Sequence, residues 1–325
     1  DLGLFNNQLN FGFEYYWKKN KNMMTDLKVG SIVGVDTPYQ NAGELKTWGW
    51  EFNVSWNHKI GDVSYQVGFN IDDPKNELKS FAGANVITEG LVKTLEGYPI
   101  NSIWGYKTDG YWSSRQEYLD YKSAHKGYES FNDGFVTGGD VKYVAQGDAD
   151  HTIGEKDLVY LGNTNPRYLY GINLAVQWKG FDFAVDFQGV GKRSFLLDAS
   201  VIAPLYYSYQ MPWTIHRDYW TEDNPNAFFP RIININGNKD LGMNYRTSDK
   251  WVQNGAYIRL KNIQLGYTIP ISKKYIENLR VYVAGTDVWE HSKVLSVYDP
   301  ETKNAAGRNI YPFFRTWTTG VNITF

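Results

Sequence analysis

The chain lacks several features that would assign it to common classes of protein. It has no cysteine among its 325 residues, which excludes a disulfide framework and cysteine-ligated metal centres. No stretch reaches the roughly 18 consecutive apolar residues that a transmembrane helix needs. Its 33 basic and 35 acidic residues leave a formal net charge of -2. A nucleic-acid-binding surface needs an excess of Lys and Arg, so we expect no nucleic acid partner.

Catalytic motifs are also missing. The five histidines are scattered, and neither a His-x-x-x-His nor a Gly-x-Ser-x-Gly pattern occurs. Aromatic residues, by contrast, are abundant, because 25 Tyr, 17 Phe and 12 Trp make up 17% of the sequence. Tyr and Trp combine an apolar ring with a polar group, which suits membrane interfaces and stacking on sugar rings. The composition therefore favours a binding or membrane protein over an enzyme.

Apolar and polar residues alternate with a period of two over many short stretches. In the last ten residues, Trp317, Val321 and Phe325 fall on one face of a strand, and Thr318 and Asn322 fall on the other. This alternation is typical of a sheet with one wet and one apolar face. The same pattern predicts further strands over residues 9–18, 48–57, 63–71, 168–178, 181–187, 263–269 and 279–285.

Other segments carry weaker or different patterns. The Asn-Lys-Asn sequence at 20–22 predicts a tight turn, with a loop-like return over 23–35, and residues 102–112 read as a strand of mixed character. Ser113 and Ser114 predict the cap of a short helix over 115–125. Alternation fails near 259–262, where either a bulge or a position above a membrane would explain the break.

The connections between the predicted strands fall into two classes. Short turns are expected at 19–21, 59–62, 179–180 and 271–277, and long connections at 72–100, 113–167, 189–255 and 290–311. Short turns on one rim and long loops on the other are typical of a transmembrane β-barrel. A soluble carbohydrate-binding β protein remains the alternative, and it would bury its apolar strand faces between two packed sheets.

Short segments across nearly the whole chain resemble one family in the family's own order. They are residues 41–44 (NAGE), 96–99 (EGYP), 165–168 (NPRY), 187–189 (FQG), 223–226 (DNPN), 255–262 (GAYIRLKN), 279–282 (LRVY) and 320–325 (GVNITF). Each segment alone is weak, but together they resemble the C-terminal part of the SusC/RagA-type TonB-dependent outer-membrane transporters of Bacteroidetes.

The resemblance implies an all-β fold in which residues 1–325 form part of a single transmembrane β-barrel domain. We expect about ten antiparallel strands of a barrel of about 22, with long extracellular loops and short periplasmic turns. The N-terminal plug, the TonB-contacting segment and the early strands would then lie outside this chain. The first strand would pair with the remaining part of the same barrel.

The resemblance also implies a location in the bacterial outer membrane, surrounded by lipid, and no enzymatic activity. It implies TonB-coupled active import of large nutrients, usually glycans, together with a SusD-like surface lipoprotein that acts as a lid. Some members of the family import oligopeptides instead. No cofactor is required by the resemblance.

The long segment 189–255 shows no sustained alternation, yet it is rich in aromatic residues. We expect several of these rings to stack on sugar rings or to contact the lid; the alternative is that they form the loop's own small core. The candidates are Tyr206, Tyr207, Tyr209, Trp213, Trp220, Tyr245 and Trp251.

The segment 146–157 overlays on an EF-hand-like calcium loop, with Gln146 at the first position. The candidate ligands at the third, fifth, seventh and twelfth positions are Asp148, Asp150, Thr152 (through its carbonyl) and Asp157. Oxygen ligands at this spacing suit Ca²⁺. Gln at the first position, His151 at the sharp turn and Asp at the last position all depart from the pattern. A loop held by Asp side-chain turns is the alternative to a calcium site.

Overall fold

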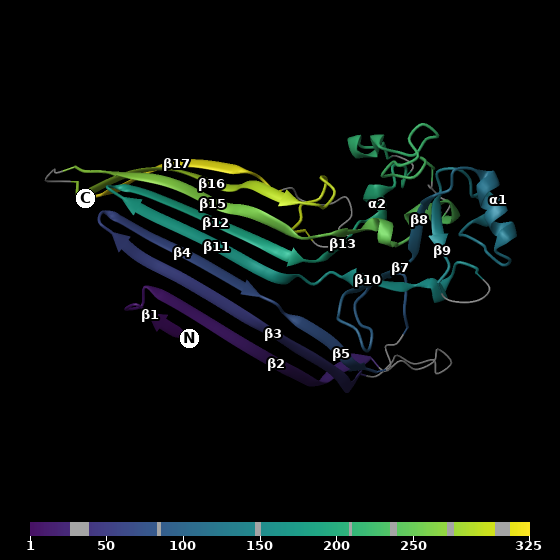
Figure 1. The fold of residues 1–325 in the computed structure, drawn as a ribbon, viewed down its shortest axis with the longest axis horizontal. Helices are drawn as coiled ribbons and strands as arrows, with labels where there is room; N and C mark the ends of the chain where they lie inside the picture. The colour runs from purple at the N-terminus through teal and green to yellow at the C-terminus, as the bar shows by residue number, and fades with distance from the viewer. Residues whose placement is uncertain are drawn as a thin grey trace.

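The computed structural model describes residues 1–26, 39–82, 86–146, 151–207, 210–234, 239–271, 276–302 and 313–325 (Figure 1). Its largest element is a ten-stranded antiparallel sheet, in which β5 (Lys75–Phe81) pairs with β3 beside the main path. The path runs through β1 (Leu2–Leu4), β2 (Leu9–Asp26), β3 (Tyr39–Ile60), β4 (Val63–Asp72), β11 (Arg167–Trp178), β12 (Phe181–Lys192), β15 (Tyr257–Ile269), β16 (Asn278–Ser292) and β17 (Thr316–Thr324).

The register of the sheet keeps apolar residues together on one face. Ile172 on β11 lies opposite Phe69 on β4 and Phe187 on β12. The neighbouring pair, Asn173 and Asp186, falls on the other face because successive side chains in a strand alternate. The predicted division into one apolar and one polar face is therefore present.

The connections are sorted by length between the two ends of the sheet. Turns at 61–62 and 179–180 lie at one end, together with the end of β15 at Ile269 and the start of β16 at Asn278, which pairs with Thr324. The long connections lie at the other end, where Figure 1 shows the loops gathered. The predicted turn at 20–22 is wrong, because β2 continues to Asp26 and pairs with the first residues of β3. Register shifts between Asn20 and Met23 and between Met23 and Met24 mark β-bulges. These bulges accommodate the polar residues 20–22 within the strand, without a turn.

The sheet forks where β4 ends. β4 and β5 both pair with β3, and the register continues across Asp73 and Pro74, which separate them. β11 pairs with β4 as far as Leu169 opposite Asp72, and beyond this point it pairs only with β12. Pro74 has no N–H to donate to a ladder, which suits the point where a strand loses a neighbour. We call this point the fork, with a β3–β5 branch and a β11–β12 branch.

A β-bulge explains the broken alternation near residues 259–262. The register of β15 shifts between Leu260 and Asn262 against both of its neighbours. On β16 the same place contains Asp287, which adopts a left-handed backbone with a φ of 53°. The bulge returns Leu260 to the face of Phe187, with which it pairs. Of the two explanations that the sequence left open, the structure therefore shows the bulge.

The long connections fold into a separate region made of small sheets and short helices. The predicted strand at 102–112 is split between two of these sheets and does not belong to the main one. The sheets contain β6 (Gly90–Val92), β7 (Ser102–Gly105) and β10 (Val159–Asn163), then β8 (Lys107–Tyr111) with β9 (Val141–Val144), and β13 (Ser194–Leu196) with β14 (Val252–Asn254). The helices are α1 (Arg115–Ala124), η2 (Asp133–Phe135), η3 (Glu155–Asp157), α2 (Ala199–Ile202), η4 (Thr214–Arg217), η5 (Lys239–Tyr245) and η6 (Asp249–Trp251).

The predicted helix at 115–125 is confirmed as α1. The Ser114 hydroxyl accepts a hydrogen bond from the Glu117 N–H at 3.1 Å, and the Glu117 carboxylate accepts one from the Ser113 N–H at 2.7 Å. These contacts satisfy backbone donors that are otherwise free at a helix start. Among the described residues, no helix is long and apolar enough to cross a membrane.

The hydrophobic core lies in this loop region and not against the sheet. One cluster surrounds Trp112 and Tyr118, and a second surrounds Phe195 and Trp251. Each cluster combines segments that are far apart in the sequence. The region is therefore a packed body at one end of the sheet.

Candidate functional site

The apolar face of the main sheet is open to its surroundings. Phe13, Trp17 and Trp317 are 58%, 70% and 66% exposed. Along the apolar faces of β3 and β11, none of the following side chains is buried: Trp50, Phe52, Val54, Ile172, Leu174 and Val176. In the described part of the chain, no second sheet covers this face. A soluble β-sandwich would bury these residues, so that alternative is excluded. An apolar face of this extent needs an apolar environment such as lipid.

The opposite face of the sheet carries paired charges. Arg280 on β16 donates to Asp182 on β12 through Nε at 2.8 Å. Asp182 lies opposite Gly266 on the intervening strand β15, and Gly266 leaves room for the Arg280 guanidinium to pass over it. This face is therefore polar, as expected for the lumen side of a barrel.

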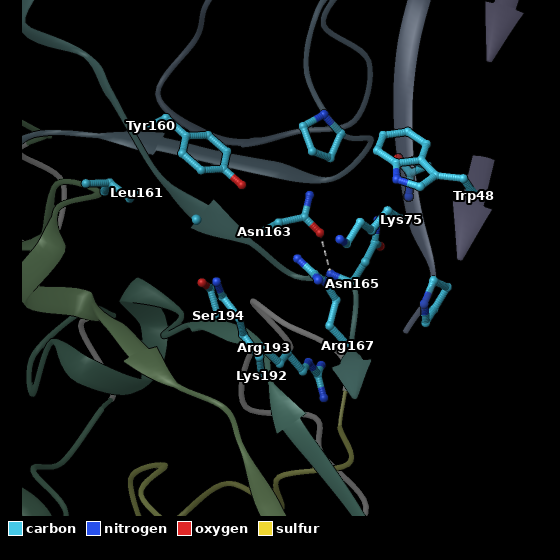
Figure 2. A pocket seen from close by; sticks show the side chains of 14 residues that line it. Trp48, Lys75, Tyr160, Leu161, Asn163, Asn165, Arg167, Lys192, Arg193 and Ser194 are labelled. Carbon is cyan, nitrogen blue, oxygen red and sulfur yellow. Dashed lines mark hydrogen bonds between the residues drawn. The ribbon is translucent and has the colours of Figure 1, made fainter. Parts of the chain in front are cut away.

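A cavity of about 440 Å³ lies at the fork, and we call it the fork pocket (Figure 2). Trp48 and Lys75 line it from the β3–β5 branch, and Arg167 and Lys192 line it from the β11–β12 branch. Tyr160 on β10 completes the wall. Figure 2 shows Tyr160 and Trp48 on opposite sides, with asparagines between them and basic residues below. The volume is within the range of small-molecule sites.

Asparagine side chains hold the wall of the fork pocket in place. The amide groups of Asn163 and Asn165 both donate to the Ile100 carbonyl, at 2.8 and 2.9 Å. The Asn165 N–H in turn donates to the Asn163 side-chain oxygen at 2.8 Å, and Asn101 donates to the Asn165 side chain. Since Pro166 follows directly, this network also fixes the direction in which β11 starts at Arg167.

A buried carboxylate lies behind the pocket. Asp73 accepts two hydrogen bonds from the Arg167 guanidinium, at 2.6 and 2.7 Å, and the Lys75 ammonium lies 3.7 Å away. Burial opposes ionisation of Asp73, but the bonds from Arg167 and the nearby Lys75 hold its pKa below the usual range. The pair joins the two branches of the fork, because Asp73 precedes β5 and Arg167 begins β11.

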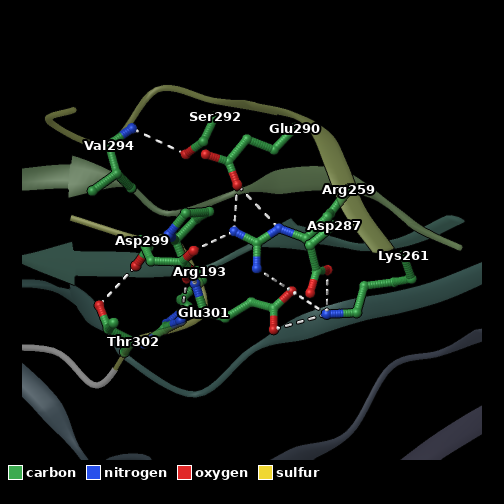
Figure 3. A network of polar contacts seen from close by, with 11 residues as sticks. Arg193, Arg259, Lys261, Asp287, Glu290, Ser292, Val294, Asp299, Glu301 and Thr302 are labelled. Atoms are coloured by element: carbon green, nitrogen blue, oxygen red, sulfur yellow. Dashed lines mark hydrogen bonds and ion pairs between the residues drawn. The ribbon is translucent and has the colours of Figure 1, made fainter. Parts of the chain in front are cut away.

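A second charged network lies at the bulge (Figure 3). Arg259, whose side chain is 1% exposed, contacts Glu290 through Nε at 3.0 Å and Glu301 through Nη1 at 2.9 Å, and it also donates to Asp299. Lys261 contacts Glu301 at 3.3 Å. Asp299 and Glu301 belong to the connection after β16, so this network anchors that connection to the sheet.

The structure separates the predicted aromatic candidates into buried and accessible groups. Tyr245 and Trp251 are 7% and 1% exposed and belong to the second core cluster, in which the Trp251 indole donates to the Asn244 carbonyl at 2.9 Å. Tyr206 packs partly against the same cluster. For these three residues the structure favours the loop-core role. Tyr207 and Trp213 are exposed and remain candidates for contacts with a ligand or a lid.

The two other aromatic candidates are Trp220, which the structure describes, and Tyr209, which it does not. Trp220 packs over the backbone of Gly138 and Gly139, and a Cβ at Gly139 would lie 2.5 Å from its ring. Gly139 also has a φ of +83°, so both its backbone and its neighbour require glycine. Trp220 therefore has a packing role within the loop region. Tyr209 lies outside the described residues.

One lysine in the loop region lies among aromatic rings. The Lys250 ammonium is 4.5 Å from the ring centre of Tyr111, 5.1 Å from that of Trp251 and 5.4 Å from that of Phe228. Burial lowers the pKa of Lys250 to about 8, although Asp218 and Asp249 act in the opposite direction. The rings stabilise the charged form in part through cation–π contacts.

The candidate calcium loop is only partly described. Asp148 and Asp150 lie outside the described residues. The Thr152 hydroxyl donates to the Gly127 carbonyl at 3.0 Å, and the buried Asp157 carboxylate accepts from the N–H groups of Gly154, at 2.8 Å, and Gln146. The described residues contain no group of three or more metal-ligating side chains. Calcium binding at this loop remains a prediction.

No family model matches the chain. It is 26% identical to TonB-dependent receptor P26 of Formosa agariphila over 354 aligned residues, which cover 100% of this chain and 34% of the receptor. It is 22% identical to TonB-dependent receptor SusC of Bacteroides thetaiotaomicron over 357 residues, with 100% and 31% covered. The chain is thus similar over its whole length to SusC-like TonB-dependent receptors.

Solved structures agree with this assignment at the level of the fold. The SusC-like chain superimposes on a structure of the RagAB peptide transporter with a TM-score of 0.76 and 20% identity, covering 99% of this chain and 34% of the other. The RagAB peptide importer in the open-open state gives a TM-score of 0.75 at the same identity, with 99% and 33% covered. The expected fold, part of a large transmembrane β-barrel, is confirmed. The SusC-like chain spans about a third of the length of these relatives.

Sequence reasoning missed several residues of the fork pocket and the bulge. Arg167 and Arg259 both lie in segments that carry the family resemblance, but their partners Asp73 and Asp299 are distant in the sequence. No local pattern marks Lys192, which ends a strand of ordinary alternation. Only the pairing of β11 with β12 brings Lys192 opposite Arg167.

Proposed function

We propose that this chain is part of a bacterial outer-membrane importer of large nutrients. In this proposal a TonB complex drives the import of oligosaccharides, and a SusD-like surface lipoprotein covers the extracellular face. The single observation that carries the proposal is the combination of an exposed apolar sheet face with a packed loop region at one end only. That architecture suits a barrel whose loops meet a partner outside the cell.

The choice of oligosaccharides over peptides is supported by aromatic rings that remain accessible. Tyr160 in the fork pocket and Tyr207 and Trp213 in the loop region are exposed, and flat rings of this kind suit the faces of sugars. The relative SusC is named as a TonB-dependent receptor, and the solved RagAB structures are titled as peptide importers. Import of oligopeptides is therefore the second candidate function.

Growth and uptake experiments test the proposal. A strain in which the gene is deleted should lose growth on one or more members of a panel of polysaccharides, and the wild-type gene should restore it. Uptake of a fluorescent oligosaccharide should stop when TonB is inactivated. Retained growth on every polysaccharide, with loss of growth on oligopeptides, would establish the peptide importer instead. Retained growth on both would refute the import function.

A further inference from the structure

The fork pocket has an excess of positive charge. Four of the residues that line it, Lys75, Arg167, Lys192 and Arg193, are basic, and none is acidic. Asp73 is the carboxylate directly behind the wall, and it is already bound by the Arg167 guanidinium. Asp72 and Glu51 also lie close to Asp73, but neither lines the cavity. The lining itself carries four cations and no carboxylate, so the surface that a ligand meets favours anions.

Among the residues that the structure describes, two of the four cations have no carboxylate partner. Lys192 is exposed and forms no ion pair with any residue that the structure describes. Arg193 donates to the carbonyl groups of Pro300 and Thr302, at 2.9 and 2.7 Å, which are neutral acceptors. Its hydrogen bonds fix the guanidinium at the edge of the pocket, but they leave its charge uncompensated.

The stability of the fold does not explain this arrangement. Arg167 and Lys192 lie directly opposite each other in the β11–β12 register. Like charges in directly opposed positions of an antiparallel pair destabilise it. Asp73 relieves this repulsion from one side only, since it binds Arg167 and not Lys192. A bound anion would relieve the rest.

The other walls of the pocket suit a sugar. The Tyr160 ring and the Trp48 ring face the cavity from opposite sides in Figure 2. The side-chain amides of Asn163 and Asn165 each donate one hydrogen bond to Ile100, and a primary amide has a second N–H to offer. Rings for stacking, amides for hydroxyl groups and cations for an acidic group thus surround one cavity.

We infer that the fork pocket binds an acidic oligosaccharide, with its carboxylate or sulfate group held between Lys192 and Arg167. This inference rests on the proposed function, because it names the substrate class of the same importer. The cavity of about 440 Å³ accommodates a short stretch of a longer chain. Selection for acidic sugars then comes from the uncompensated charge of Lys192 and Arg193, and orientation comes from Tyr160 and the asparagines.

Binding measurements on the full-length transporter in detergent test the inference. The probes are uronate-containing and sulfated oligosaccharides, each with its carboxyl-reduced or desulfated counterpart, and oligoglutamate peptides. We expect the acidic sugars to bind about tenfold more tightly than their neutral counterparts, as charge-assisted hydrogen bonds require. Lys192→Gln should remove most of this preference, and Lys192→Arg should retain it.

The same hairpin provides a matched control. Lys179 lies in the turn at the other end of β11 and β12, is exposed, and lies 3.6 Å from Asp62. Lys179→Gln removes the same charge from the same hairpin and should leave every affinity unchanged. Lys192 is exposed, so Lys192→Gln should also leave the barrel folded, which heat-modifiable migration in gels would verify.

Several results would overturn the inference. Equal affinity for acidic and neutral sugars would do so, as would an unchanged preference in Lys192→Gln or failure of every acidic sugar to bind. Binding of oligoglutamate alone, with the same dependence on Lys192, would replace the sugar by an acidic peptide. TonB-dependent uptake tests the proposed function separately from this inference. Uptake of neutral oligosaccharides without charge preference would retain the proposed function and reject the inference.

Discussion

Replacing Arg259 by methionine should release the connection after β16 from the sheet. The Arg259 side chain is 1% exposed and contacts three carboxylates, those of Glu290, Asp299 and Glu301. Arg259→Met keeps much of the volume, but within the described residues only Glu301 then retains a basic contact, with Lys261. The carboxylates of the connection would then move outward to regain water.

The expected magnitude follows from the burial of the partners. Removing one member of a buried ion pair typically costs about 3–5 kcal/mol. The Glu290 side chain is 36% exposed and regains water easily, whereas those of Asp299 and Glu301 are 11% and 19% exposed. We therefore expect the lower end, about 3 kcal/mol, which corresponds to roughly a hundredfold change in the local opening equilibrium.

Amide hydrogen exchange measures this opening directly. The Tyr298 and Thr302 amides donate to the carbonyl groups of Leu295 and Asp299, at 2.9 and 3.0 Å, and should exchange faster in Arg259→Met. The double variant Arg259→Met/Glu301→Gln should recover part of the protection because one fewer charge is unpaired. Arg280→Met, which removes an arginine with a single carboxylate partner, should not affect these amides. Unchanged exchange in Arg259→Met would refute the anchoring role.

Three further predictions concern the sheet and the loop region. Val67→Arg puts a charge on the apolar face and should cost about 2–4 kcal/mol in urea unfolding from lipid vesicles, whereas Gln66→Arg on the polar face should be tolerated; equal effects would contradict the orientation of the sheet. Trp251→Ala should cost about 3–5 kcal/mol and expose the loop region to protease, and unchanged resistance would argue against its core role. Because burial places the pKa of Lys250 at about 8, below the 10.5 of an exposed lysine, the loop region should gain stability as the pH rises from 8 towards 10.5. Tryptophan fluorescence during urea unfolding should show this gain in the wild type and not in Lys250→Met.

The strands of the main sheet could be predicted because each needs one apolar face along its whole length. Phe13, Trp17 and Trp317 carry that signal locally, and no distant residue is needed to read it. The turn expected at 20–22 was wrong for a related reason. Asn residues favour turns, but a β-bulge accommodates them equally well, and only the pairing of β2 with β3 shows which of the two is formed.

The fork pocket could not be predicted from local pattern. Asp73 and Arg167 are 94 positions apart and meet only because β4 and β11 are neighbours in the sheet. The burial of Trp251 likewise depends on segments that are distant in the sequence, such as Phe195 in β13. Aromatic content in a loop therefore indicated that the loop is ordered, but not which rings face outward.

The fork also marks depth within the membrane. Unpaired strand edges are not tolerated in the hydrocarbon core, because no water reaches them there, so the sheet can divide only above it. β4, the strand that ends at the fork, is 10 residues long, and a tilted strand needs about 9–11 residues to cross a bilayer. The outer boundary of the hydrocarbon then lies level with Asp72 and Leu169. Asp73, Arg167 and the pocket they support then lie immediately above that boundary, in contact with water and not with lipid.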